Sequence, residues 1–167
     1  TSDPKIPEQP SGKNGWVGRS YYQNGQKVIS KWIYDSQYKS YFYLNAAGDY
    51  VENAWVGNYY LKSGGYMAKS EWIYDGNYGS YYYLTSEGSY ARNAWSGSYY
   101  LKSNGKMAKR EWIYDNNYKS YYYLTSEGSY ARNKWVGDYY LKSDGKMAVS
   151  ERTPDGYRVD GSGKWIK

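Results

Sequence analysis

Tryptophan and tyrosine are the residues of this chain whose types and spacing could do chemistry. The 167 residues include 27 Tyr and 8 Trp but a single Phe. A ring face attracts a cation with about 0.5 to 2 kcal/mol per contact, so rings left partly open between neighbouring elements could form a cation cage. A quaternary ammonium is the usual guest, because it is bulky, cannot donate a hydrogen bond and loses its water easily. The other interpretation is that the rings are simply core.

Six of the tryptophans recur with an alternating spacing. They stand at positions 32, 55, 72, 95, 112 and 135, so the gaps alternate between 23 and 17 residues. Residues 72–111 return as residues 112–151 with 8 of 40 positions changed, and residues 32–71 are a looser copy. Self-similarity at a fixed period of about 20 to 50 residues marks a repeat protein. The repeating unit is therefore a long segment followed by a short one.

Both segments are predicted to be β-hairpins. The short segments place Gly57-Asn58, Gly97-Ser98 and Gly137-Asp138 between aromatic runs, and such pairs favour two-residue hairpin turns. The long segments have a wider loop, as at 75–77, followed by a strand at 80–84 in which alternate tyrosines share a face. Nothing shows helical periodicity. An isolated hairpin is marginal in water, so we expect an all-β repeat protein whose hairpins stack on one another.

The chain divides into three predicted parts. Residues 1–15 hold three of the four prolines and are expected to be a flexible leader or linker. Residues 16–151 are expected to form seven hairpins. Residues 152–167 lack the Trp due at 152 and are interpreted as a C-terminal cap, with Trp165 covering the end. No apolar run approaches the roughly 18 residues of a membrane span, and Thr1 opens neither a signal nor a transit peptide, so the chain is interpreted as an excised or processed piece.

Composition argues against catalysis and metal binding. With no Cys and no His, the chain lacks thiol chemistry, a disulfide framework and the commonest metal ligand, so we expect neither a metal site nor a cofactor. Catalysis would also need a constellation that occurs once, whereas the carboxylates recur with the repeat. We interpret them as turn and surface residues of a non-catalytic chain: Asp35, Asp75 and Asp115; Glu71, Glu111 and Glu151; Glu87 and Glu127.

The repeat resembles a known family. The order Trp, turn, Tyr-Tyr-Leu, Gly, Met-Ala, carried here by Trp95, 99–101, Gly105 and 107–108 and again from Trp135, resembles the choline-binding, cell-wall-binding repeats of streptococcal surface proteins and phage lysins. The long variant is similar to repeats in the choline-binding module of the pneumococcal cell-separating glucosaminidase. The resemblance covers residues 16 to about 167. It implies a left-handed β-solenoid of hairpins with alternating long and short units, and an extracellular place on the bacterial cell wall. The implied partner is choline or phosphorylcholine on teichoic or lipoteichoic acid.

In that family a choline sits between consecutive hairpins. Its walls are the opening Trp and first strand aromatic of one repeat, with the third strand aromatic of the next. Carried onto this sequence, the resemblance implies three complete cages: Trp32, Tyr41 and Tyr60; Trp72, Tyr81 and Tyr100; Trp112, Tyr121 and Tyr140. At the short-to-long junctions the first-aromatic position is Asn58, Ser98 or Asp138. We expect those junctions to bind weakly or to serve only as core, with Trp55, Met67 and Tyr83 at one and Trp95, Met107 and Tyr123 at another.

Other partners were weighed against choline. A carbohydrate-binding solenoid is the main alternative, because glucan-binding and clostridial toxin repeats share the hairpin, and stacked aromatics bind sugars. The complete Trp-Tyr-Tyr sets and the Met-Ala segments favour choline. Single-stranded nucleic acid would need a continuous track of lysines, which the net charge of +6, spread through the repeats, does not provide. Lys62, Lys102 and Lys142 are expected either to be solvated or to meet phosphates. Any hydrolase would be a separate module of the parent protein.

Overall fold

The computed structural model describes residues 12–167. Within them it contains antiparallel strands and one short 3-10 turn, η1 (Ser63–Gly65), but no α-helix. The strands are β1 (Gly15–Val17), β2 (Ser20–Gln23), β3 (Gln26–Lys27), β4 (Lys31–Asp35), β5 (Ser40–Leu44), β6 (Ala54–Val56), β7 (Tyr59–Leu61), β8 (Glu71–Asp75), β9 (Ser80–Leu84), β10 (Ala94–Ser96), β11 (Tyr99–Leu101), β12 (Glu111–Asp115), β13 (Ser120–Leu124), β14 (Lys134–Val136) and β15 (Tyr139–Leu141). The prediction of an all-β protein built from repeated hairpins is confirmed. Most of the predicted leader, 1–11, lies outside the described residues.

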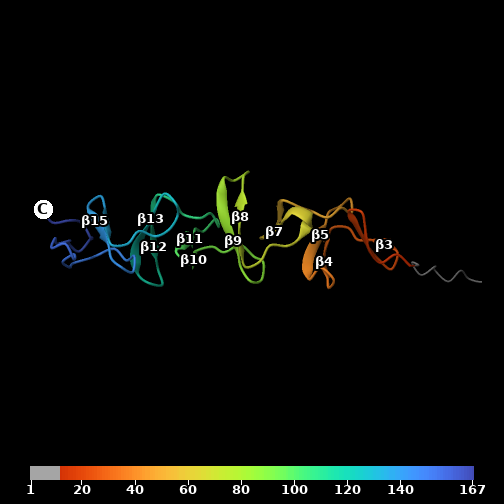
Figure 1. Cartoon of the computed structure of the whole chain (residues 1–167), viewed down its shortest axis with the longest axis horizontal. Helices are drawn as coiled ribbons and strands as arrows, with labels where there is room; N and C mark the ends of the chain where they lie inside the picture. The colour runs from red at the N-terminus through yellow and green to blue at the C-terminus, as the bar shows by residue number, and fades with distance from the viewer. Residues whose placement is uncertain (1–11) are drawn as a thin grey trace, which may run out of the picture. The chain divides into compact units, whose positions relative to one another are not determined.

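The strands form one three-stranded sheet, β1-β2-β3, and six two-stranded hairpins that follow one another along the chain (Figure 1). The contacts divide the chain into two compact units. The first runs to Ile73 and includes Leu84–Tyr90, and the second comprises Tyr74–Tyr83 and Ala91–Lys167. Each unit is described by itself below. No helix among residues 12–167 has the length and apolar character to cross a membrane.

The short hairpins close through the expected two-residue turns. In β6-β7, Val56 pairs with Tyr59, so only Gly57 and Asn58 lie between the paired residues. Gly57 has φ of 59°, a left-handed conformation that glycine adopts without steric cost. The turns of β10-β11 and β14-β15 have the same register and the same glycine φ. The Gly-X signal therefore fixed both the position and the length of these turns.

The long hairpins close through a four-residue loop organised by an aspartate. In β4-β5, Asp35 pairs with Ser40, and its carboxylate accepts hydrogen bonds from the backbone N–H groups of Gln37 (2.8 Å) and Tyr38 (3.2 Å). Asp75 and Asp115 close their loops in the same way. The expected turn role of these aspartates is confirmed. Their side chains are buried, however, rather than on the surface as expected.

Cross-strand pairing gives each hairpin two distinct faces. In β4-β5, Trp32 pairs with Tyr43 and Tyr34 with Tyr41, so these four rings share one face. Phe42 points to the opposite face. Neighbouring hairpins pack against these two faces.

The face that carries Phe42 meets the preceding hairpin, because the Phe42 ring lies 5.0 Å from Trp16. The second unit repeats this arrangement, with Tyr122 of β13 lying 5.0 Å from Trp95. Each such hairpin therefore turns its Trp face toward the next hairpin and its other face toward the previous one.

The buried core consists of small clusters along the chain. The leucine that ends the second strand of each hairpin is fully buried, at positions 44, 61, 84, 101, 124 and 141. One cluster gathers Val28, Ile33, Phe42 and Leu44, with Trp16 packed against it. A thin repeat structure thus buries one leucine per hairpin and covers it with half-buried aromatic rings.

An indole hydrogen bond also joins some hairpins to the element that follows. Trp16 Nε1 donates to Asp35 Oδ2 at 2.8 Å, and Trp95 Nε1 donates to Asp115 Oδ2 at 2.7 Å. Burial raises the pKa of Asp115, but its hydrogen bonds from Tyr118, Trp95 and Asn117 outweigh this, and the net pKa lies below the usual value. The same aspartate therefore closes its own loop and fixes the preceding tryptophan.

Residues 152–167 form turns and isolated bridges rather than strands, pairing Arg152 with Arg158 and Val159 with Trp165. The Trp165 ring lies 6.4 Å from Trp135 and 5.6 Å from Tyr157. Trp135 Nε1 donates to Asp155 at 2.8 Å. These contacts place the C-terminal segment against the last hairpin, β14-β15, in the way a cap would lie.

Candidate ligand-binding cages

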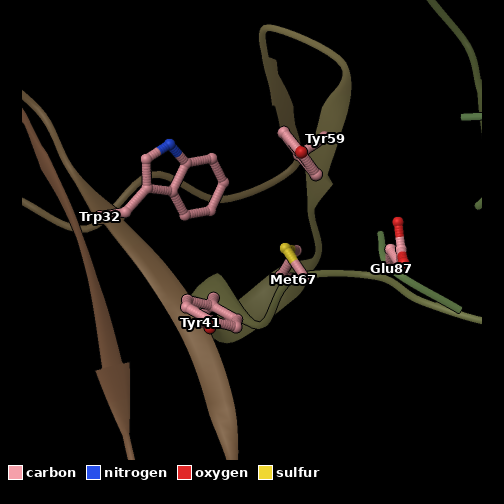
Figure 2. A pocket seen from close by; sticks show the side chains of 5 residues that line it. All are labelled: Trp32, Tyr41, Tyr59, Met67 and Glu87. Atoms are coloured by element: carbon pink, nitrogen blue, oxygen red, sulfur yellow. The ribbon is translucent and has the colours of Figure 1, made fainter. Parts of the chain in front are cut away.

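The first unit contains an aromatic cavity of about 280 Å³ beside β4-β5 and β6-β7 (Figure 2). Its lining comprises Trp32 of β4, Tyr41 of β5, Tyr59 of β7, and Met67 and Glu87 from the segments that follow. Figure 2 shows the three rings around the Met67 thioether, with Glu87 beyond it. The walls therefore come from two consecutive hairpins, from the segment after them (Met67) and from the turn after β9 (Glu87).

The rings are held in place but remain open to solvent. Trp32 and Tyr59 meet edge to face, with centroids 5.5 Å apart and planes at 74°. The backbone N–H of Met67 donates to the carbonyl oxygen of Tyr41 at 3.1 Å, which ties the methionine segment to β5. Tyr41 remains 47 % exposed. A ligand could therefore reach the ring faces without a rearrangement of the backbone.

A second cavity, of about 400 Å³, repeats this design within the second unit. Its lining comprises Trp112, Tyr121, Tyr139, Met147 and Ser162. The centroids of Trp112 and Tyr139 are 5.6 Å apart with planes at 73°, and Tyr121 is 47 % exposed. The ring geometry of the first cavity is thus reproduced 80 positions along the chain. We call the two sites the Trp32 cage and the Trp112 cage.

A glycine supports the methionine of each cage. A Cβ added to Gly88 would lie 2.6 Å from Met67 Cε, and one added to Gly163 would lie 2.6 Å from Met147 Cε. Both glycines have φ near 90°, where other residues are strained. The absent side chain leaves room for the thioether beneath the rings.

The cages combine aromatic faces, a thioether and few hydrogen-bonding groups. Ring faces are electronegative, and a thioether is polarisable, so such walls suit a cation that presents methyl groups rather than N–H donors. Their volumes lie at the low end of the roughly 300 to 1,000 Å³ typical of small-molecule sites. The arrangement fits one small quaternary ammonium in each cage.

The wall contributed by the following hairpin differs by one residue from the expectation. Tyr60 and Tyr140 were expected there, but Tyr59 and Tyr139 line the cavities. Tyr60 packs against Trp55 at 5.1 Å, and Tyr140 packs against Trp135 at 5.2 Å. The reason is that the wall must come from the backward face of the next hairpin. Neighbouring strand residues point to opposite faces.

The expected middle cage is divided between the two units. Trp72 belongs to the first unit, whereas Tyr81 and Tyr100 belong to the second. Within the second unit Tyr100 packs against Trp95, with centroids 5.1 Å apart. The middle cage therefore stays a prediction.

The tryptophans of the short hairpins are engaged in packing. Trp55 contacts Tyr60 at 5.1 Å and Tyr90 at 5.9 Å in the first unit. Trp95 contacts Tyr100, Tyr122 and Tyr130, besides its hydrogen bond to Asp115. These contacts agree with a core role, one of the two roles left open for them.

Two of the remaining residues of the expected weaker sites, Tyr123 and Met67, lie at the cages instead. Tyr123, which was expected beside Trp95, packs against Trp112 at 5.2 Å. Tyr83 accepts a backbone hydrogen bond from Ala91. Met107 is buried, and Met67 lines the Trp32 cage instead of a short-to-long junction.

A third cavity beside Trp95, of about 420 Å³, has a charged lining that includes Asp144 and Lys146. Lys146 Nζ stands 5.5 Å from the Tyr118 ring centroid. Burial, followed by the Asp115 and Asp144 carboxylates, raises the pKa of Tyr122 to about 12. The exposed Tyr118 ring at this junction therefore already lies near a cation of the protein, the Lys146 ammonium group.

The lysines proposed as phosphate contacts form ion pairs within the protein. Lys62 pairs with Glu71 at 3.1 Å, Lys102 with Glu111 at 3.2 Å, and Lys142 with Glu151 at 3.3 Å. Another lysine lies nearer a predicted wall, because Lys109 Nζ is 6.0 Å from the Tyr81 ring centroid. Among residues 12–167, no group of three or more carboxylates is placed to hold a metal ion.

Sequence reasoning missed five lining residues: Tyr59, Glu87, Tyr139, Met147 and Ser162. The two tyrosines could have been found by requiring that each hairpin face its predecessor and its successor with opposite sides. Glu87 and Ser162 each precede the glycine that contacts the cage methionine. Only that contact, which joins residues 21 positions apart in one copy (Met67 and Gly88) and 16 in the other (Met147 and Gly163), reveals them.

Comparison with known proteins identifies the family of this chain. The family model described as choline-binding repeat matches residues 49–90, 89–130 and 129–165. The chain belongs to the choline-binding repeat family. This confirms the resemblance drawn from the sequence, and the three matches follow the long-and-short period.

Two solved proteins and one curated relative from Streptococcus pneumoniae are similar to this chain. The choline-binding domain of CbpL is 57% identical, with a TM-score of 0.86 over 92% of this chain and 86% of that one. Choline-binding protein F is 28% identical, with a TM-score of 0.64 over 93% of this chain and 58% of that one. A putative endo-beta-N-acetylglucosaminidase of serotype 4 is 48% identical over 59 residues, which are 32% of this chain and 9% of the relative. The match thus spans less than a tenth of that curated relative.

Proposed function

We propose that this choline-binding repeat protein binds choline or phosphorylcholine in aromatic cages between successive hairpins. The observation that carries the proposal is the recurrence, in each compact unit, of one lining: a tryptophan and a tyrosine from a long hairpin, a tyrosine from the next hairpin and a methionine. The walls offer ring faces to the trimethylammonium group. The phosphate would remain outside, in solvent.

Repetition supports a polymeric ligand. A single cage of about millimolar affinity corresponds to roughly 4 kcal/mol, which is too weak to retain a protein on a surface. Several cages that engage one polymer of repeated choline groups raise retention by avidity without any new contact. We therefore propose that the chain attaches its parent protein to choline-bearing teichoic or lipoteichoic acid at the extracellular bacterial surface. A left-handed solenoid would set successive cages along that polymer.

The proposed role is attachment rather than catalysis. The carboxylates of the periodic aspartates accept hydrogen bonds within their turns. Those of the periodic glutamates at 71, 111 and 151 form ion pairs with lysines. Curated relatives carry the name of an endo-beta-N-acetylglucosaminidase, and this chain matches a small part of them. We propose that the parent protein carries a cell-wall hydrolase module separate from these repeats.

The test is a choline titration followed by tryptophan fluorescence, with sodium chloride at matched ionic strength as the blank. We expect a saturable change at millimolar choline, because a cation on the ring faces alters tryptophan emission. Trp112→Ala should remove one site and lower the bound choline counted by calorimetry.

Tyr118→Ala is the matched control, since it removes an exposed ring of the same hairpin outside the Trp112 cage. It should bind choline as the unaltered chain does. A chain that binds a wall glycan but shows no response to tens of millimolar choline would overturn the proposal in favour of carbohydrate binding.

A further inference from the structure

We propose that the two cages differ in charge, and that Glu87 makes the Trp32 cage more selective for a cationic ligand than the Trp112 cage. This inference rests on the proposed choline binding and concerns which of the two cages is more selective for a cation. It starts from the lining, because the Trp32 cage includes Glu87 and the Trp112 cage includes Ser162. The other four lining residues are of the same type in both cages.

Glu87 and Ser162 occupy equivalent positions. Each precedes the glycine that contacts the cage methionine, Gly88 in one copy and Gly163 in the other. The turns share a hydrogen bond as well, from Gly88 N–H to the Thr85 carbonyl and from Gly163 N–H to the Asp160 carbonyl, both at 2.9 Å. The structure thus contains its own matched pair, in which one copy has a carboxylate and the other a hydroxyl.

The Glu87 carboxylate has no ion-pair partner within the described residues 12–167. Glu52, Glu71 and Glu111, by contrast, each pair with a basic side chain. Figure 2 shows Glu87 on the far side of Met67 from Trp32, at the edge of the cage. A cation held by the rings would therefore have one carboxylate without an ion pair at the edge of its cage.

The Trp112 cage has no equivalent charge in its lining. The Ser162 hydroxyl donates to Asp160 Oδ1 at 2.7 Å. That carboxylate also accepts the backbone N–H groups of Ser162 and Lys164, and Lys164 lies close enough to lower its pKa further. Asp160 is thus compensated within its own turn and is not part of the lining.

The size of the effect follows from Coulomb's law. Glu87 is exposed, so water screens its interaction with a cation in the cage. In a water-like dielectric, one unit charge at the edge of the cage changes the choline affinity by roughly two- to fourfold. The effect should decline in high salt, because the Debye length falls from about 10 Å at 0.1 M to 3 Å at 1 M.

The experiment uses full chains in which one of the two cages is removed. Trp112→Ala leaves the Trp32 cage and Trp32→Ala leaves the Trp112 cage, each also carrying Trp72→Ala to remove the predicted middle site. Each chain is titrated by calorimetry with choline chloride and with 3,3-dimethylbutan-1-ol, the uncharged molecule of the same shape. The titrations are run in 20 mM and in 1 M sodium chloride.

In the chain with the Trp32 cage, Glu87→Ser should lower choline affinity about two- to fourfold at low salt and leave the alcohol unchanged. In the chain with the Trp112 cage, Ser162→Glu should raise choline affinity by a similar factor. Glu87→Gln, which keeps the shape of the side chain, should behave like Glu87→Ser. Both differences should approach onefold in 1 M salt.

Lys69 and Val149 are another charge difference between the copies, each following its cage methionine by two residues. Lys69→Val is therefore measured beside Glu87→Ser. Loss of a positive charge should raise choline affinity, so the two variants should act in opposite directions.

The outcomes separate this inference from the proposed function. If no chain binds choline, the proposed function fails. If the unaltered cages bind choline but Glu87→Ser changes nothing at low salt, the charge inference is overturned and the function stands. A variant that weakens choline and the alcohol equally would also overturn it, since Glu87 would then act through structure.

Discussion

In the folded protein the Asp115 carboxylate is buried and joins two hairpins. The sequence predicts Asp115 to be a turn residue on the surface. Its carboxylate accepts two backbone N–H groups of its own loop and the indole N–H of Trp95, 20 residues earlier. These hydrogen bonds favour the ionised form and outweigh the cost of burial, so the pKa of Asp115 lies below its usual value. The recurrence of the aspartate predicted a turn. The bond to the indole depends on how the previous hairpin packs, which the local sequence does not show.

Asp115→Asn is expected to lower the free energy of unfolding by about 1 kcal/mol at pH 7, because an uncharged amide accepts these N–H groups less strongly than the carboxylate does. The folded pKa lies below the unfolded value of about 3.9. The contribution of Asp115 is therefore complete above about pH 4 and is lost as the pH falls through the folded pKa. Urea unfolding at pH 7 and pH 3, followed by near-ultraviolet circular dichroism, should show the variant and the unaltered chain converging at the acid pH.

Asp144→Asn is the control for the acid experiment, since Asp144 is an exposed turn residue whose side chain accepts a backbone N–H from Lys146. It should have a smaller effect at pH 7. An Asp115 variant that is destabilised equally at both pH values would contradict the ionised hydrogen-bond network.

At the scale of the element, the four-residue loops of the long hairpins place their last residue in a left-handed conformation. Lys39 and Lys119 have φ of 54° and 52°, whereas the middle copy has Gly79 at 63°. Such a conformation costs a residue with a Cβ roughly 1 to 2 kcal/mol, and glycine avoids most of this at an entropic cost of about 0.5 to 1 kcal/mol. The same turn therefore ends in a lysine in two copies and in a glycine in the third.

Lys119→Gly is expected to stabilise the protein by about 0.5 to 1 kcal/mol, the difference between these two costs. Thermal unfolding followed by circular dichroism should show a melting temperature higher by about 1 to 4 °C. Gly79→Ala, made in the same loop of the preceding copy, should lower it. A lower melting temperature for Lys119→Gly would mean that the lysine side chain contributes more than its backbone conformation costs.

The hairpins themselves were predictable, because their signals are local. Gly-X pairs marked the short turns, and alternation within a strand placed the first and third strand tyrosines, such as Tyr41 and Tyr43, on one face. The cage wall from the next hairpin was not found, since Tyr59 and Tyr60 are identical side chains on opposite faces of β7. Choosing between them requires knowing which face of a hairpin meets its predecessor. That is a packing relation with no signature in a single repeat.

At the scale of the whole molecule, several cages on one chain couple ligand binding to stability. Each site that binds only the folded state adds RT ln(1 + [L]/Kd) to the free energy of unfolding. Above saturation the stability of a two-state chain should therefore rise by about 1.4 kcal/mol per occupied site for each tenfold increase in choline. Urea unfolding in 10 and 100 mM choline, with matched sodium chloride, should give the number of sites.

Trp112→Ala should reduce this increment by one site, whereas Tyr118→Ala should leave it unchanged. An increment that is the same in sodium chloride as in choline would indicate a general salt effect and argue against specific cages. Two unfolding steps that respond separately to choline would show that the two compact units unfold independently.

The indole hydrogen bonds have a consequence for how the chain acquires its structure. Trp16 reaches Asp35 and Trp95 reaches Asp115, partners only 19 and 20 positions apart. Contacts of short sequence separation favour rapid folding, even in a protein made entirely of strands. A hairpin held by such a bond can therefore dock as soon as the next 20 or so residues have been synthesised. A nascent chain would thus form its structure one hairpin after another.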